Sequence, residues 1–128
     1  MEEIVITSDS TCDLSESQLK ENDIRIMPLS VILGEKTYKD GIDIQPSDIF
    51  RYFDDTGNLP KTAAPSVAEY EEFFRPFVDS GKTVIHFNIS SKASGSHGFA
   101  QTASKSFGGK VYVVDSHALS TGQGLLVM

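Results

Sequence analysis

The sequence lacks the features that would place it in several large functional classes. Only 11 of its 128 residues are Lys or Arg, against 18 Asp or Glu, and the net charge of −7 argues against binding to a nucleic-acid backbone. No apolar run approaches the roughly 20 residues of a membrane span, and no signal peptide opens the chain. We therefore expect a cytoplasmic protein that is not integral to the membrane and does not bind nucleic acid.

Cysteine and histidine are also scarce. The single cysteine, Cys12, excludes an internal disulfide framework and fits a reducing compartment. The three histidines are scattered without the spacing of metal ligands, so we predict no metal site. Gly122-Gln123-Gly124 does not follow a strand directly and lacks a third glycine, so it is not a dinucleotide-binding fingerprint.

What the chain does contain is an alternation of strand-like and helix-like segments. The third helix begins at a Ser66–Glu69 capping box, and Pro76 inside its apolar pattern predicts a kink or an early end. The alternation predicts an α/β fold, one layered αβα domain with a mostly parallel sheet. Strands are expected near 3–7, 24–33, 36–38, 83–89 and 111–114, helices near 14–22, 46–53, 67–78 and 96–107, and a loop at 61–66.

Three of these apolar strands run into loops rich in Ser, Thr and Gly. Residues 4–7 lead into 8–11, residues 84–89 into 90–96, and residues 111–114 into Asp115 and Ser116. The carboxyl ends of parallel strands meet at one edge of a sheet, and ligands bind there. Hydroxyls and free backbone N–H groups with few charges suit an anionic head group, so the sequence predicts an anion site at this edge.

Candidate residues for that site each have a simpler alternative. Ser94-Gly95-Ser96 precedes a helix, where unpaired N–H groups favour a carboxylate or phosphate, but serine at this place also serves as a plain cap. For Thr62 the two alternatives are a hydroxyl that lies at the same edge of the sheet and a residue that only forms a turn before a proline. Asp9, Ser10 and Asp13 are interpreted as turn or capping residues, with Asp13 capping the first helix. Asp115 is expected to hold neighbouring loop N–H groups.

Two other function classes stay open on the residues alone. A small serine hydrolase would use Ser94 as nucleophile, His86 or His97 as base and Asp115 to orient the base. Against it, Ser94 lacks glycines two residues away on either side, and a histidine within a strand, such as His86, is more often a core residue. The other class is a protein-interaction module whose loops contact a partner protein.

Five segments carry a family resemblance, and they occur in that family's order. They are 7–14, 38–43, 61–66, 89–96, and 114–116 followed by 120–124. Together they resemble the DegV family of bacterial fatty-acid-binding proteins. The resemblance implies that residues 1–128 are the N-terminal domain of a two-domain protein about twice this length, truncated before the second lipid-binding domain. It also accounts for the apolar stub at 125–128, whose alternative interpretation is a short C-terminal strand or helix packed on the core. The isolated domain is expected to self-associate to cover its exposed face.

The resemblance further implies a function without catalysis. The chain would bind the carboxylate of a long-chain fatty acid through Thr62 and Ser94, with support from Gly95, Ser96, Ser10, Ala63, Asp115 and Ser116. It would need no cofactor, and it would present the lipid to a separate ATP-dependent fatty acid kinase for acyl-phosphate formation and phospholipid synthesis.

The chain also departs from the family pattern near these residues. Ala63-Ala64 stands where Ser-Gln is usual, and Ala93 where Leu is usual. Ser96-His97 replaces Thr-Tyr, and we expect His97 to be a surface residue of the helix's first turn rather than a donor to the head group.

Overall fold

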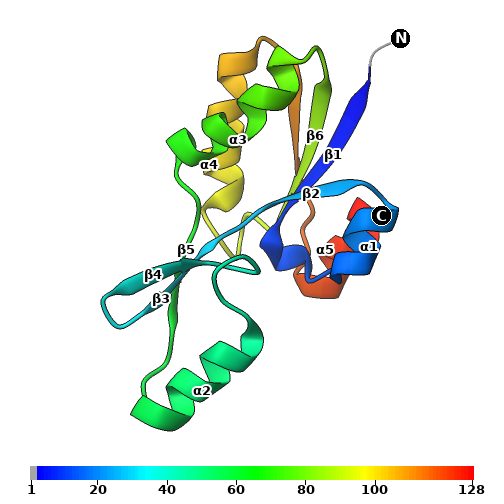
Figure 1. The fold of residues 1–128 in the computed structure, drawn as a ribbon. Coiled ribbons are helices and arrows are strands. Elements are labelled where there is room, and N and C mark those ends of the chain that lie inside the picture. Colours follow the sequence, from blue (N-terminus) through cyan, green and yellow to red (C-terminus); the bar gives the residue numbers. More distant parts are fainter. Residues whose placement is uncertain (1–2) are drawn as a thin grey trace.

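The computed structural model describes residues 3–128, and its main part is a parallel sheet with helices on both faces (Figure 1). One face carries α3 (Val67–Asp79) and α4 (Ser96–Ser104), and the other carries α1 (Glu16–Glu21) and α5 (Ser120–Val127). The predicted α/β layering is confirmed. The four strands, in the order β2-β1-β6-β7, are β1 (Ile4–Asp9), β2 (Ile24–Met27), β6 (Thr83–Asn88) and β7 (Val111–Asp115).

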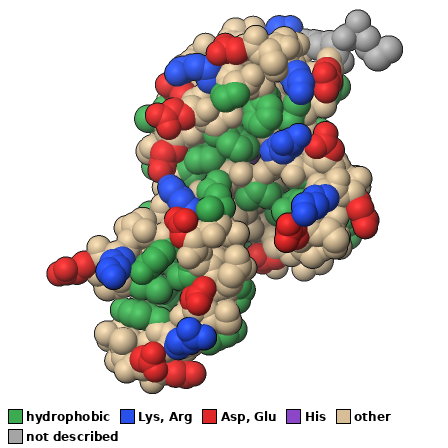
Figure 2. Space-filling model, viewed as in Figure 1, with side chains coloured by type: hydrophobic (Ala, Val, Ile, Leu, Met, Phe, Trp, Pro, Cys, Tyr) green, Lys and Arg blue, Asp and Glu red, His purple; other side chains and the backbone are tan. Residues whose placement is uncertain are grey.

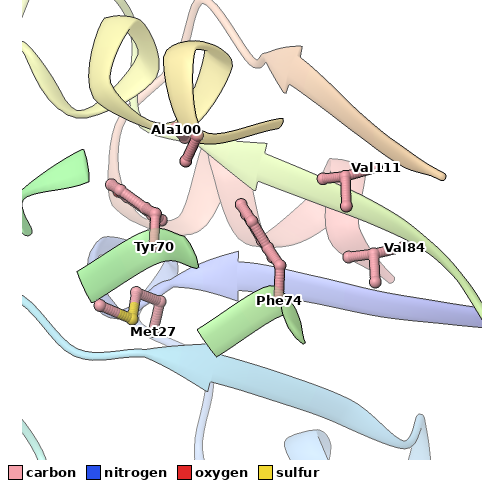
Figure 3. Close-up of a cluster of buried hydrophobic side chains, with 7 residues drawn as sticks. Met27, Tyr70, Phe74, Val84, Ala100 and Val111 are labelled. Carbon is pink, nitrogen blue, oxygen red and sulfur yellow. The ribbon is translucent and has the colours of Figure 1, made fainter. Parts of the chain in front are cut away.

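Two apolar clusters, one on each face of this sheet, hold the layers together. On one face, Tyr70 and Phe74 of α3 pack with Val84 of β6 and Val111 of β7 (Figure 3). On the other face the cluster is formed by Cys12, Ile24 and Val127. Side chains along a strand alternate between faces, which is how one sheet serves both clusters. Full burial of one side chain such as Phe74 stabilises the fold by about 2 kcal/mol.

A second, antiparallel sheet lies beside the main layer, next to α2 (Pro46–Thr56) (Figure 1). Its strands, in the order β4-β3-β5, are β3 (Ser30–Leu33), β4 (Lys36–Lys39) and β5 (Lys61–Ala63). Figure 2 shows apolar side chains gathered on this part of the molecule, and Phe50, Phe53 and Leu59 are all exposed. Self-association of the domain stays a prediction.

The expectation of one strand over 24–33 is wrong. The segment divides into β2 in the large sheet and β3 in the small one. Pro28 lies at the break and has no N–H to continue a strand ladder. The next N–H, that of Leu29, donates instead to the Ser10 hydroxyl at 3.1 Å. The expected loop at 61–66 is also partly wrong, because 61–63 pairs with β3.

Three helix boundaries were predicted from local signals, with mixed outcomes. Asp13 is not the cap of α1. It has a φ of +54° after the 3-10 turn at Ser10–Cys12, and Ser15 caps α1 in a reciprocal box with Gln18. The Ser66–Glu69 capping box is confirmed. The helix does not end at Pro76, since α3 continues to Asp79. Among residues 3–128, no helix is long and apolar enough to cross a bilayer.

Candidate functional site

A small cavity lies at the carboxyl edge of the large sheet, where the small sheet approaches it. Its volume is about 180 Å³. Thr62 and Ser94, which are far apart in the sequence, both line it, so the structure brings the two predicted hydroxyls into one space. The complete lining is Thr11, Leu29, Thr62, Ala63, Ala64, Ile89, Ala93, Ser94 and Ser96.

Backbone pairing places Thr62 at this cavity. Thr62 belongs to β5, where it lies opposite Val31 of β3. Among residues 3–128 its hydroxyl has no hydrogen-bond partner, so the hydroxyl is free to donate to a ligand. A threonine in a merely structural turn would be expected to bond its own backbone.

Ser94 is held from both sides in the loop between β6 and α4. Its N–H donates to the Ser90 carbonyl at 3.2 Å, and its Oγ accepts the N–H of Ser96 at 3.2 Å. The second contact provides an acceptor for one of the unpaired N–H groups at the start of α4, so Ser94 does have the capping role that was the simpler alternative. Because Ser94 also lines the cavity, capping and ligand binding do not exclude each other.

The other predicted supporting residues lie around the cavity rather than in it, apart from Ala63 and Ser96. The Ser10 hydroxyl fixes Leu29 and faces a neighbouring cavity of about 440 Å³. Gly95 precedes α4 as its N-cap position. The Ser116 hydroxyl bonds only within its own turn, to Ala118.

Asp115 holds the loop that carries Ser94, as predicted. Its Oδ1 accepts the N–H of Ser91 at 3.1 Å and that of His117 at 3.0 Å. Hydrogen bonding from the Ser91 side chain contributes most to lowering the pKa of Asp115, to about 2, and the N–H groups of His117 and Ser91 lower it further. The carboxylate therefore stays ionised at neutral pH and continues to accept from the loop.

A buried polar cluster around Asp9, which was not predicted, lies at the end of β1. Asp9 is 2% exposed, and its carboxylate accepts from the Tyr70 hydroxyl at 2.6 Å, from Asn88 Nδ2 at 2.7 Å and from His86 Nε2 at 3.0 Å. Burial raises the pKa of Asp9, but the bonds from His86, Tyr70 and Asn88 outweigh it and the pKa is lowered overall. Asp9 is thus no simple turn residue. The sequence signal that could have predicted this cluster is the polar pair His86 and Asn88, which lie two residues apart and so on the same face of β6.

The histidines do not assemble a hydrolase with Ser94. His86 is fully buried between Asp9 and Thr7, whose hydroxyl lies 2.7 Å from Nδ1. His97 lies in the first turn of α4 as expected but is half-buried, and its Nδ1 lies 3.3 Å from Asn88 Oδ1. Within the described part of the chain no histidine is hydrogen-bonded to Ser94, and Asp115 contacts Ser91 and His117 instead.

Behind the cavity, Gln123 joins α5 to the edge of the sheet. It is fully buried, donates to Ser8 Oγ at 3.0 Å and accepts from Thr11 Oγ1 at 2.9 Å. The adjacent Gly124 permits this approach, because a Cβ there would lie 2.8 Å from the Cys12 carbonyl oxygen. The motif at 122–124 therefore serves close packing beside Thr11, one of the cavity residues.

Comparison with known proteins places the chain in a family. Residues 3–128 match the family described as uncharacterised protein, DegV family. A DegV domain-containing protein of Clostridium acetobutylicum is 35% identical over 129 residues, which cover 99% of this chain and 45% of the relative. The chain thus spans less than half the length of this curated relative.

Two solved structures share the fold closely. A stearic acid-binding protein from Eubacterium ventriosum superposes with a TM-score of 0.89 at 38% identity, over 99% of this chain and 45% of that one. A DegV family protein from Thermus thermophilus, described by its fatty acid binding, gives a TM-score of 0.89 at 33% identity, over 98% of this chain and 45% of that one. With a family match over nearly its whole length, the chain belongs to the DegV family.

Proposed function

We propose that this chain binds the carboxylate of a long-chain fatty acid, with the Thr62 and Ser94 hydroxyls as hydrogen-bond donors. The observation that carries the proposal is that both hydroxyls line one cavity at the carboxyl edge of the parallel sheet. The fatty-acid-binding relatives from Eubacterium ventriosum and Thermus thermophilus support the class of ligand.

The chemistry of the cavity suits a carboxylate. Hydrogen bonds to an ionised group are stronger than those between neutral groups, so two hydroxyls supply substantial affinity without a cation. The start of α4, at Ser96, adds the partial positive charge of a helix N-terminus. Phosphate binds at helix N-termini for the same reasons, so the arrangement tolerates an acyl phosphate as well.

The size of the cavity indicates which part of the ligand it holds. Pockets that enclose a whole drug-sized ligand measure about 300–1,000 Å³, whereas this one measures about 180 Å³. It therefore suits the head group, and we propose that the acyl chain is enclosed with the help of a second domain. Ala63, Ala64 and Ala93, three departures from the family pattern, all line the cavity. Ala63-Ala64 in place of Ser-Gln leaves the cavity less polar, and Ala93 in place of Leu leaves it roomier.

Binding without catalysis is the role that these residues support. We propose that a separate ATP-dependent kinase phosphorylates the bound carboxylate and that the acyl phosphate enters phospholipid synthesis. Lipid-loaded protein mixed with ATP alone should then form no acyl phosphate, and formation should begin when the kinase is added. Product formed without a kinase would contradict this division of labour.

The ligand itself can be tested directly. We expect organic extraction of the purified protein, followed by mass spectrometry, to release fatty acids of about 14 to 18 carbons, because such chains supply the apolar area that drives binding. A folded protein that binds no fatty acid, either as purified or after incubation with one, would contradict the proposal. A stable protein complex without lipid would favour the interaction-module alternative.

A further inference from the structure

The hydroxyl of Ser94 has a neighbour that controls where its proton points. Ser96 N–H donates to Ser94 Oγ at 3.2 Å, and Ser96 Oγ lies 3.0 Å from the same atom. A serine hydroxyl has one proton and two acceptor lone pairs. When Ser96 donates through both its N–H and its hydroxyl, both lone pairs of Ser94 are filled, and the Ser94 proton is left to point to a ligand in the cavity.

Ser96 is 5% exposed at the start of α4 and lines the same cavity as Ser94. Its hydroxyl is therefore shielded from bulk solvent and has Ser94 Oγ as its neighbour at 3.0 Å.

We propose that Ser96 is a positioning residue that sets the direction of the Ser94 hydroxyl for an anionic head group. With a carboxylate in the cavity, Ser96 donates to Ser94 and Ser94 donates to the ligand. Every hydroxyl keeps one proton in this arrangement.

This inference rests on the proposed function and names the residue that positions one of its two donors. Without the Ser96 hydroxyl, one lone pair of Ser94 is unfilled, and the Ser94 hydroxyl loses the donor that orients and polarises it toward the ligand. Carboxylate binding should then weaken by about fivefold to tenfold, the usual effect of one hydrogen bond. Because Ser96 acts through Ser94, the loss should vanish when Ser94 is already alanine.

The test is a double-mutant cycle with the Ser96→Ala, Ser94→Ala and double variants, read out by the affinity for myristic acid at about pH 8, where a carboxylic acid is ionised. Ser104→Ala is the matched control, since Ser104 is on the same helix and its hydroxyl donates to the Gln101 carbonyl. We expect weaker binding by Ser96→Ala, no further loss in the double variant beyond that of Ser94→Ala, and wild-type affinity for Ser104→Ala.

Two results would overturn the inference while leaving the proposed function in place. One is full affinity of Ser96→Ala beside weakened binding by Ser94→Ala. The other is an additive loss in the double variant, which would show that Ser96 acts through general structure rather than through Ser94. Full affinity of Ser94→Ala would instead contradict the proposed function itself, and the inference with it. Thermal unfolding of each variant checks that the fold is retained.

Discussion

Replacing both Thr62 and Ser94 by alanine is expected to weaken fatty-acid binding by about 100-fold or more. Each hydroxyl donates to an ionised carboxylate, and such a bond contributes about 1.5–3 kcal/mol, so each single variant should lose about tenfold or more. Thr62 has no partner among residues 3–128, so its removal breaks no bond within the described structure. The Thr62→Ala single variant therefore reports on the ligand alone, whereas Ser94→Ala also removes the contacts of Ser94 Oγ with Ser96. Titration of the variants with a fluorescent fatty acid measures the affinities.

A matched control separates this effect from a general loss of hydroxyls. Thr102 and Ser104 lie on α4, and their hydroxyls donate to backbone carbonyls of that helix, at Gly98 and Gln101. The Thr102→Ala/Ser104→Ala protein should bind fatty acid as the wild type does. If the Thr62/Ser94 double variant also retained wild-type affinity, these two hydroxyls would not form the carboxylate site.

The Asp9→Asn substitution is expected to lower the free energy of unfolding by about 3 kcal/mol, because it breaks a buried charged cluster. The carboxylate accepts from Tyr70, His86 and Asn88, and an amide would direct its own donors at one of these groups. Asp79 is exposed at the end of α3, so Asp79→Asn should change stability by no more than about 0.5 kcal/mol. Urea denaturation at neutral pH measures both variants.

The same variant should show a characteristic dependence on pH. The folded-state pKa of Asp9 lies below its unfolded value of about 3.9, so its stabilising contribution is complete above that value. As the pH falls from about 4 through the folded-state pKa, that contribution is lost. The difference in unfolding free energy between wild type and Asp9→Asn should therefore narrow below about pH 4. A difference that stays constant to pH 2 would show that the charge of Asp9 contributes nothing.

Sequence periodicity predicted the layers because it reports burial directly. Apolar residues at helical or strand spacing, such as Tyr70 and Phe74 in α3, are buried only when that face packs on another element. The division of 24–33 between two sheets was not predicted, because alternation along a strand says nothing about which strand is its partner. Pro28 was the local signal for the break.

The site was predicted in part for a related reason. Parallel strands bring their carboxyl ends together, so the loops that hold Ser94 and Asp115 were expected at one edge. The buried position of Asp9 depends on hydrogen bonds from Tyr70 of α3 and Asn88 of β6. These partners are 61 and 79 residues away in the sequence, so the contacts produce no periodic pattern from which they could be predicted. The same holds for His97, whose partner Asn88 becomes a neighbour only once β6 and α4 are folded.

The most direct test is a crystal structure of the protein with a bound fatty acid. The account predicts that the carboxylate lies within hydrogen-bonding distance, about 2.5–3.0 Å, of both Thr62 Oγ1 and Ser94 Oγ. A larger apolar cavity lined by Leu14, Leu19 and Ile26 lies nearby and offers an alternative location. A fatty acid whose carboxylate lay there, or anywhere out of reach of both hydroxyls, would contradict the account.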